Sequence, residues 1–254
     1  MKLAKTILLL FLGLLIIPIF SIIILSFHSS NGNPFKWYGV ILQNENFTTA
    51  FILSVLISAC TAILNGSLSF ILALSWFNKR QLFLVLIMIL ILGLLPPDIL
   101  ALSISKISQF VGISDSNLFF VMIGLTLYTL PFGVLLFWSR FYFIEAATIA
   151  TAKDIGIRKF YIVTKVILPL SKATMISCLL LTFLLAFNEY PRTYYLSGSY
   201  VLVSEFLNGK LSSGADESIY AGGSITIIIT AFSIIILALL SAFFSRRRLS
   251  VKAD

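Results

Sequence analysis

The sequence predicts an all-α membrane protein, a polytopic bundle of six transmembrane helices. Of its 254 residues, 59% are hydrophobic and only 11% are charged, whereas soluble domains carry about 25% charged residues. The mean hydropathy is +1.05, and the apolar residues gather in six runs, each close to the roughly 20 residues that a helix needs to cross hydrocarbon. The predicted spans are residues 7–27, 48–76, 82–104, 118–143, 171–187 and 219–244. We expect one transmembrane domain over residues 1–254.

The first apolar run, residues 7–27, is predicted to be a retained helix and not a cleaved signal peptide. A signal peptide has an apolar core of about 7–15 residues followed by a small-residue cleavage site. This run is longer, and His28-Ser29-Ser30 follows it without such a site. We expect a polar loop over residues 28–47.

The next three spans differ in their small residues and prolines. The second span, residues 48–76, is rich in Ser, Thr, Ala and Gly, which allow helices to approach closely, so we expect it to pack inside the bundle. The third contains Pro96-Pro97-Asp98, and a double proline breaks or sharply kinks a helix. The fourth contains Pro131, where we expect a second kink. Loops are predicted at residues 106–117 and 188–217.

Residues 145–169 form a polar segment between two long apolar runs. Its several charged side chains would be costly in lipid, so it must lie in water. We expect a helix over about residues 144–153 that ends near Gly156, because glycine is a common residue at helix C-termini. A second helix from about Lys159 is expected to lead to Pro169 and the fifth span.

The basic residues orient the chain in the membrane. Fourteen of the 18 Lys and Arg residues fall on the side of the two termini and of the 145–169 segment. The other side holds Lys36, Lys106, Arg192 and Lys210. Because Lys and Arg concentrate in cytoplasmic loops, both termini and the segment are predicted to be cytoplasmic. This asymmetry accounts for the net charge of +8, and we expect no nucleic acid partner.

Enzymatic and metal-binding classes find little support. The chain has no G-x-x-x-x-G-K-[ST] motif and so no phosphate-binding loop for ATP. Cys60 and Cys178 lie inside apolar runs, without metal-type spacing, and His28 is the one histidine. We expect no catalytic residue, no metal site and no cofactor in this chain.

The 145–169 segment resembles the signature of ABC-importer permeases, E-A-A-x-x-x-G followed nine residues later by I-x-L-P. Gly156, Val166 and Leu168-Pro169 reproduce the spacing from the glycine to the Leu-Pro pair, and Asp154-Ile155-Gly156 matches the family's D-L-G. In this register the box is Ala150-Thr151-Ala152, so Ala150 replaces the family's glutamate. The literal Glu-Ala-Ala at residues 145–147 lies five residues too early.

Other stretches resemble the spermidine/putrescine subgroup of these permeases. Trp37-Tyr38 followed by Phe47 looks like the subgroup's W-Y…N-x-x-F pattern, and residues 95–99 resemble P-x-I-V-P-[DE]-I. Residues 187–190 and 193–198 resemble F-[DN]-[DE]-F-x-x-T-x-F-x-x-G. The resemblance covers about residues 34–230.

This resemblance implies a type I importer permease in the cell inner membrane, one half of a pore that moves a small solute, with a polyamine as the expected solute. The implied partners are ABC ATPase subunits that bind ATP and Mg, a second permease subunit (a copy or a paralogue), an extracytoplasmic solute-binding protein and membrane lipid. The residues expected to dock the ATPase are Ala150, Thr151, Ala152, Lys153, Asp154, Gly156, Arg158, Lys159, Leu168 and Pro169. The alternative for this segment is a solvated basic loop that serves only membrane orientation.

Two acidic residues are candidates for the substrate path, since intramembrane acids mark pathways or structural pairs. Asp98 follows the double proline, and Glu189 neighbours Tyr190, Tyr194 and Tyr195, a setting that suits an organic ammonium. The alternative for Glu189 is an ion pair with Arg192. For the whole chain, the alternatives are an ATP-independent secondary transporter or channel, and a non-transporting membrane scaffold.

Overall fold

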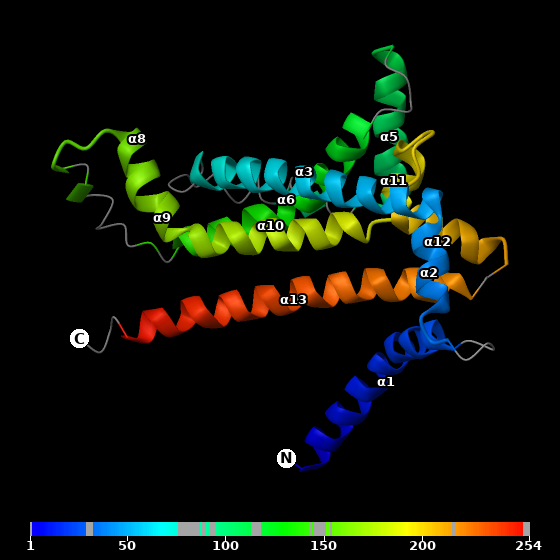
Figure 1. Ribbon diagram of the computed structural model, residues 1–254. Helices are drawn as coiled ribbons and strands as arrows, with labels where there is room; N and C mark the ends of the chain where they lie inside the picture. Colours follow the sequence, from blue (N-terminus) through cyan, green and yellow to red (C-terminus); the bar gives the residue numbers. More distant parts are fainter. Residues whose placement is uncertain are drawn as a thin grey trace. The chain divides into compact units, whose positions relative to one another are not determined.

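The computed structural model describes residues 2–28, 33–75, 87, 90–91, 95–112, 118–142, 144, 151–152, 154–214 and 217–250, and among these residues all regular structure is helical (Figure 1). This confirms the all-α prediction. The chain divides into two compact units, each built from two stretches of sequence. Unit 1 comprises Met1–Leu53 and Val201–Phe232, and unit 2 comprises Ser54–Tyr200 and Ser233–Asp254.

In unit 1, a tyrosine of a short helix hydrogen-bonds to two other helices. Its helices are α1 (Lys2–Phe27), α2 (Lys36–Gln43), the first residues of α3 (Glu45–Ser75), α12 (Val203–Ser212) and the first part of α13 (Ser218–Ser250). The Tyr38 hydroxyl of α2 hydrogen-bonds to the hydroxyls of Ser26 at 2.8 Å and Ser224 at 2.7 Å. Tyr38 therefore joins α1 to α13, and the predicted polar loop over residues 28–47 contains a helix.

Unit 2 carries the candidate site. Its helices are the rest of α3 and α13, α5 (Pro97–Phe110), α6 (Leu118–Tyr142), α8 (Lys159–Ile162), the π-helical η1 (Val163–Ile167), α9 (Leu168–Leu170), α10 (Lys172–Phe187) and α11 (Pro191–Leu196). The helical part of residues 106–117 extends to Phe110, and residues 188–217 contain α11 and α12, so both predicted loops are shorter than expected.

A buried polar network joins three helices of unit 2. Asn65 of α3 is fully buried, and its Nδ2 donates to the Thr182 hydroxyl of α10 at 2.7 Å and to the Thr129 carbonyl of α6 at 3.2 Å. The Ser69 hydroxyl donates to Asn65 Oδ1 at 2.8 Å. A side chain at Gly133 of α6 would collide with Ser69, so the glycine lets α6 approach α3. One side of the second span packs against α6 and α10, where its small residues lie.

The predicted spans correspond to helices to different degrees. Among the described residues, three helices are long and apolar enough to cross a membrane: Glu45–Ser75, Leu118–Tyr142 and Ser218–Leu239. A fourth candidate is Lys159–Leu170 with Lys172–Phe187, counted as one bent span. Ile16–Phe27 is a shorter apolar helix. The number six, with cytoplasmic termini, stays a prediction.

Ten of the 23 residues of the third predicted span, residues 82–104, lie outside the described residues. Its described part is interrupted where the double proline predicts a break. Pro96 has an extended ψ of 133°, and α5 begins at Pro97, which occupies a first-turn position where its missing N–H costs nothing. Pro131, by contrast, lies within one continuous helix, α6.

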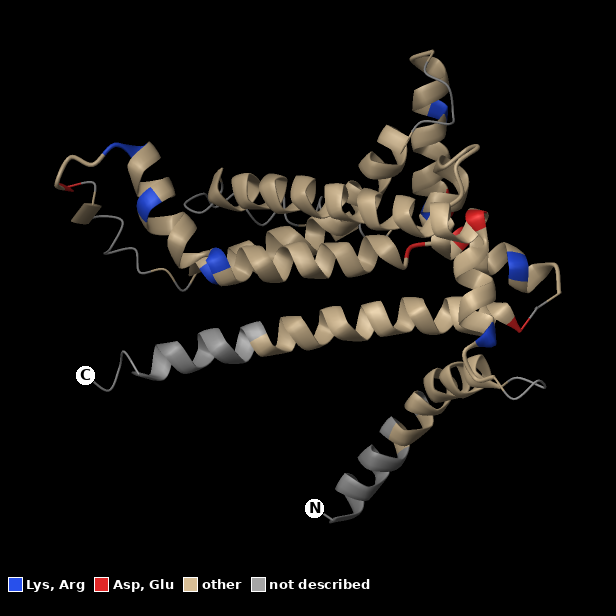
Figure 2. Cartoon of the chain, in the orientation of Figure 1, with Lys and Arg blue, Asp and Glu red and all other residues tan. Residues whose placement is uncertain are grey.

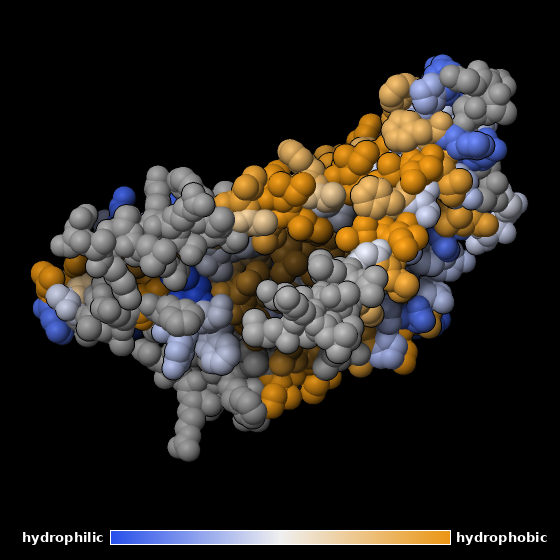
Figure 3. Space-filling view, turned by 90° about the horizontal axis from the view of Figure 1, so that it is seen from below, coloured by the Kyte–Doolittle hydropathy of each residue, from blue (hydrophilic) through white to orange (hydrophobic). Residues whose placement is uncertain are grey.

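The exposed side chains agree with a lipid environment. On α3, Leu56, Ile63 and Ile71 are 57–61% exposed, on the side of the helix away from the buried Asn65 and Ser69. Hydrophobic colour covers much of the described part of the face shown in Figure 3. Such a surface would be unfavourable in water and is expected where helices face lipid.

Candidate functional site

The predicted docking segment begins with a defined helix end. The Ile157 N–H donates to the Ala152 carbonyl and the Ile155 N–H to the Thr151 carbonyl, both at 3.1 Å. Gly156 has a φ of +79°, and the six-residue bond across it is that of a Schellman motif. Nothing lies within 4 Å of a Cβ built on Gly156. The glycine is therefore required by its backbone conformation and not by crowding. Ala150 and Lys153 lie outside the described residues.

The second half of the segment is one helical run, Lys159–Leu170, with a π-helical turn in its centre. The Leu168 N–H bonds to the Val163 carbonyl, five residues back. A widened turn relieves the clash that the ring of Pro169 would otherwise cause with the preceding turn. The Leu-Pro pair thus stands inside the helix. The helix breaks at Ser171 instead, and α10 continues at an angle of 69°.

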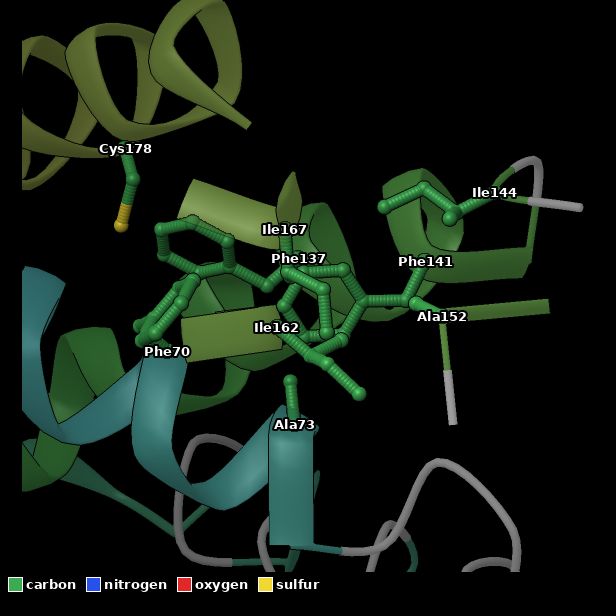
Figure 4. Close-up of a cluster of buried hydrophobic side chains, with 9 residues drawn as sticks. All are labelled: Phe70, Ala73, Phe137, Phe141, Ile144, Ala152, Ile162, Ile167 and Cys178. Atoms are coloured by element: carbon green, nitrogen blue, oxygen red, sulfur yellow. The ribbon is translucent and has the colours of Figure 1, made fainter. Parts of the chain in front are cut away.

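Apolar side chains anchor the segment to the ends of three helices (Figure 4). Ala152, Ile162 and Ile167 come from the segment and are 3–8% exposed. They share a buried cluster with Phe70 and Ala73 of α3, Phe137 and Phe141 of α6, Ile144, and Cys178 of α10. Phe70 stands edge-on to Phe137, with 5.4 Å between ring centroids. The segment is consequently held against α3, α6 and α10 by packing.

The opposite side of the segment is exposed and combines apolar with basic residues. Ile155 and Phe160 are each 72% exposed, and Tyr161 is 52% exposed. The predicted docking residues Asp154, Gly156, Arg158, Lys159, Leu168 and Pro169 are also exposed, as is Thr151, whereas Ala152 is buried. In Figure 2, blue positions mark the helical run from its first residues to its junction with α10.

The sequence motif did not point to Phe160 and Tyr161, and it included Ile155 only as the middle residue of Asp154-Ile155-Gly156. The signal that could have identified them is the presence of large apolar residues between charges in a segment predicted to lie in water. Apolar residues that remain exposed beside basic ones are typical of a protein interface.

The predicted substrate-path residues lie on α5, on α11 and in the two positions before α11, and these two helices of unit 2 pack against each other. Asp98 is exposed in the first turn of α5. Glu189 precedes α11, and its carboxylate accepts a hydrogen bond from Arg192 Nη1 at 2.6 Å, with 10% and 4% of the two side chains exposed. The ion pair that the sequence offered as an alternative is therefore present.

The Arg192 guanidinium also stacks on an aromatic ring of α6. Its central carbon lies 4.0 Å from the centroid of the Tyr128 ring, a cation–π contact that holds the positive charge in a buried setting. Tyr190, Tyr194 and Tyr195 form an aromatic row beside this pair, with neighbouring centroids 5.7 and 5.3 Å apart. Tyr194 and Tyr195 are 52% and 41% exposed. Among the described residues, no group of three potential ligands could hold a metal ion.

Comparisons with known proteins match nearly the whole chain. The spermidine/putrescine transport system permease protein PotC of Escherichia coli (strain K12) is 26% identical over 231 residues, 87% of each chain. PotC of Haemophilus influenzae is 26% identical over 237 residues, 89% of this chain and 91% of the relative. No protein-family model matches.

Solved structures share the fold. A bacterial ABC transporter involved in the import of the acidic polysaccharide alginate has a TM-score of 0.72 at 15% identity, over 96% of each chain. The MetNI methionine ABC transporter in inward-facing conformations has a TM-score of 0.57 at 14% identity, over 82% of this chain and 99% of that one. The sequence similarity and the shared fold together identify this multi-pass membrane protein as a permease of the ABC importer class.

Proposed function

We propose that this permease docks an ATP-binding cassette ATPase through residues 145–169 and uses ATP hydrolysis in that partner to move solute by alternating access. The observation that carries the proposal is the two-sided segment. Its buried side packs against α3, α6 and α10, while Ile155, Phe160 and Tyr161 stay exposed among basic residues. A rigidly held, exposed segment of this kind suits transmission of force better than a solvated loop does.

The composition of the exposed side favours a partner groove with an apolar floor and an acidic rim. Phe160 and Tyr161 would supply the buried anchors of such an interface, and Arg158 and Lys159 would supply charge complementarity. In this proposal apolar contact takes over part of the docking role of the missing glutamate at Ala150. ATP and Mg belong to the ATPase.

The remaining parts of the complex are proposed from the relatives. The alginate transporter was crystallised with a periplasmic protein that carries the alginate pentasaccharide, and we infer a solute-binding protein for this chain as well. Six spans in a single domain, with both termini in the cytoplasm, would make half of a pore. A second permease subunit, a copy or a paralogue, would complete it.

Spermidine or putrescine is the proposed solute, supported by the PotC relatives. The fold does not choose the solute, because its structural relatives are named for alginate and methionine. The exposed Tyr194 and Tyr195 offer π faces to an organic ammonium. Because Glu189 is already paired with Arg192, its carboxylate would contribute at the rim of the path and not as an unpaired anion.

Co-purification with a matched pair of variants tests the docking proposal. The tagged chain is expressed in the cells that encode it and purified in lipid nanodiscs. We expect Phe160→Ala to lose most of the co-purified ATPase. Phe110→Ala, which removes a 94% exposed phenylalanine from α5, should retain it. A chain that takes up spermidine in proteoliposomes with no ATPase present would show a secondary transporter instead. Stable assembly with an ATPase but no uptake of any solute would favour the scaffold.

A further inference from the structure

An arginine of α6 makes a hydrogen-bonded contact with the end of the helical run Lys159–Leu170. Arg140 stands in the last turn of α6, and its Nε and Nη2 both donate to the Leu170 carbonyl, at 2.9 and 2.6 Å. Leu170 is the last residue of the helical run Lys159–Leu170. The guanidinium therefore holds the end of the docking segment directly.

The place of this contact is the bend before α10. Carbonyls in the last turn of a helix have no partner within the helix, and a cation is favourable at that end of the helix dipole. Ser171, which follows, is fully buried with a φ of −100° and a ψ of 3°, and its hydroxyl has no hydrogen-bond partner among the described residues. The Ser171 N–H bonds to the Ile167 and Leu168 carbonyls, so the backbone hydrogen bonds continue to the bend, and Arg140 adds a side-chain contact from α6 at the same point.

The apolar cluster and the arginine restrain the segment in different ways. Packing of Ile162 and Ile167 against Phe137 and Phe141 resists separation, but apolar contacts have little directional preference. Two N–H groups of one planar guanidinium that share a carbonyl oxygen are directional, because hydrogen bonds weaken when their angle changes. A change in the tilt of the run would therefore pull on α6 through Arg140.

We propose that Arg140 is the positioning residue that transmits movement of the docked segment to α6 and α10. The proposal rests on the function proposed above, because it takes the ATPase as the source of the movement. Arg140 touches neither solute nor nucleotide in this account. It determines how much of a movement of the docking segment is passed on to the α11 region, where Tyr194 is exposed.

The test measures the accessibility of residue 194 on α11 while nucleotide binding to the ATPase moves the docking segment. The permease is purified with its ATPase in nanodiscs, with Tyr194→Cys as a reporter in a Cys60→Ala background; Cys178 is fully buried and stays. The rate of maleimide labelling is compared with and without Mg-ATP and vanadate. ATPase content, basal hydrolysis and melting temperature are measured on the same samples.

Three variants separate positioning from folding. In Arg140→Ala we expect the nucleotide-dependent change in labelling to fall about tenfold, within the range of typical allosteric couplings, while ATPase content and melting temperature stay near wild type. Arg140→Lys keeps the charge without the fork and should retain part of the response. Lys172→Ala removes an exposed charge at the start of α10 and should respond fully.

The other possible results either overturn the role proposed for Arg140 or overturn the proposed function. A full response in Arg140→Ala, with ATPase bound, overturns the inference and leaves the proposed function standing. If Arg140→Ala does not assemble, a wild-type response in Arg140→Lys overturns it and a reduced response supports it. If the unaltered chain binds no ATPase, or its labelling ignores nucleotide, the proposed function fails and the inference fails with it.

Discussion

The docking segment and the α11 region belong to the same compact unit but are held by opposite kinds of contact. The segment rests on an apolar cluster in which Phe137 is fully buried. The α11 region rests on the Glu189–Arg192 ion pair and on the stacking of Arg192 over Tyr128. Apolar packing tolerates substitutions that conserve volume, whereas a buried ion pair tolerates the loss of neither partner. The two ends should therefore respond differently to mutation.

The largest effect is expected at the apolar end. Phe137→Ala removes a ring that contacts Phe70 and Phe141 and should cost about 4 kcal/mol of unfolding free energy, as large-to-small core substitutions do. Thermal unfolding in nanodiscs measures it. Phe137→Leu should cost less than about 1.5 kcal/mol. Equal losses in the two variants would show that ring geometry, not packing volume, holds the segment.

The ion pair should show the converse pattern. Glu189→Ala leaves a buried guanidinium without its counter-charge, and we expect a loss of about 3 kcal/mol. Glu189→Gln keeps the size of the side chain but also removes the charge, so we expect it to lose nearly as much unfolding free energy as Glu189→Ala. Asp98→Asn, at an exposed position, is the control and should stay within about 0.5 kcal/mol of wild type. Unchanged melting of Glu189→Gln would mean that the stacking on Tyr128 carries the contact.

The smallest effect on global stability is expected at Gly156, where function should suffer more than folding. Gly156→Val places a branched residue at a φ of +79°, which costs about 1–2 kcal/mol locally. The helix end before it should unravel, and ATPase binding should weaken about tenfold. Gly156→Asn should bind nearly normally, because Asn adopts left-handed backbone more readily. The comparison is made by titrating purified ATPase onto each variant. Equal affinities would show that the Schellman end is not part of the dock.

Most helix positions could be predicted from apolar periodicity and length. The fourth predicted span, residues 118–143, corresponds to α6, and the fifth, residues 171–187, to α10. Such runs are long enough for composition alone to indicate them. The short helices α2, α11 and α12 were missed because tertiary contacts, such as that of Tyr38 with Ser26, hold them more than local propensity does.

The site was predictable in its motif but not in its geometry. Gly156 could be recognised as a helix end from its residue type. A helix from about Lys159 was expected to lead to Pro169 and the fifth span, but neither the π turn before Pro169 nor the break at Ser171 could be predicted. The stacking of Arg192 on Tyr128 joins residues 64 positions apart, and the contact of Arg140 with Leu170 joins residues 30 apart. Contacts of this separation require the folded structure.

Photo-cross-linking tests the docking of the ATPase most directly. A benzophenone maleimide is attached to Phe160→Cys in the Cys60→Ala background, and the purified complex is irradiated. The account predicts an adduct between the permease and the ATPase subunit from Phe160→Cys, and none from Phe110→Cys on α5. Absence of an adduct at residue 160 in a complex that contains ATPase, or equal adducts from both positions, would contradict it.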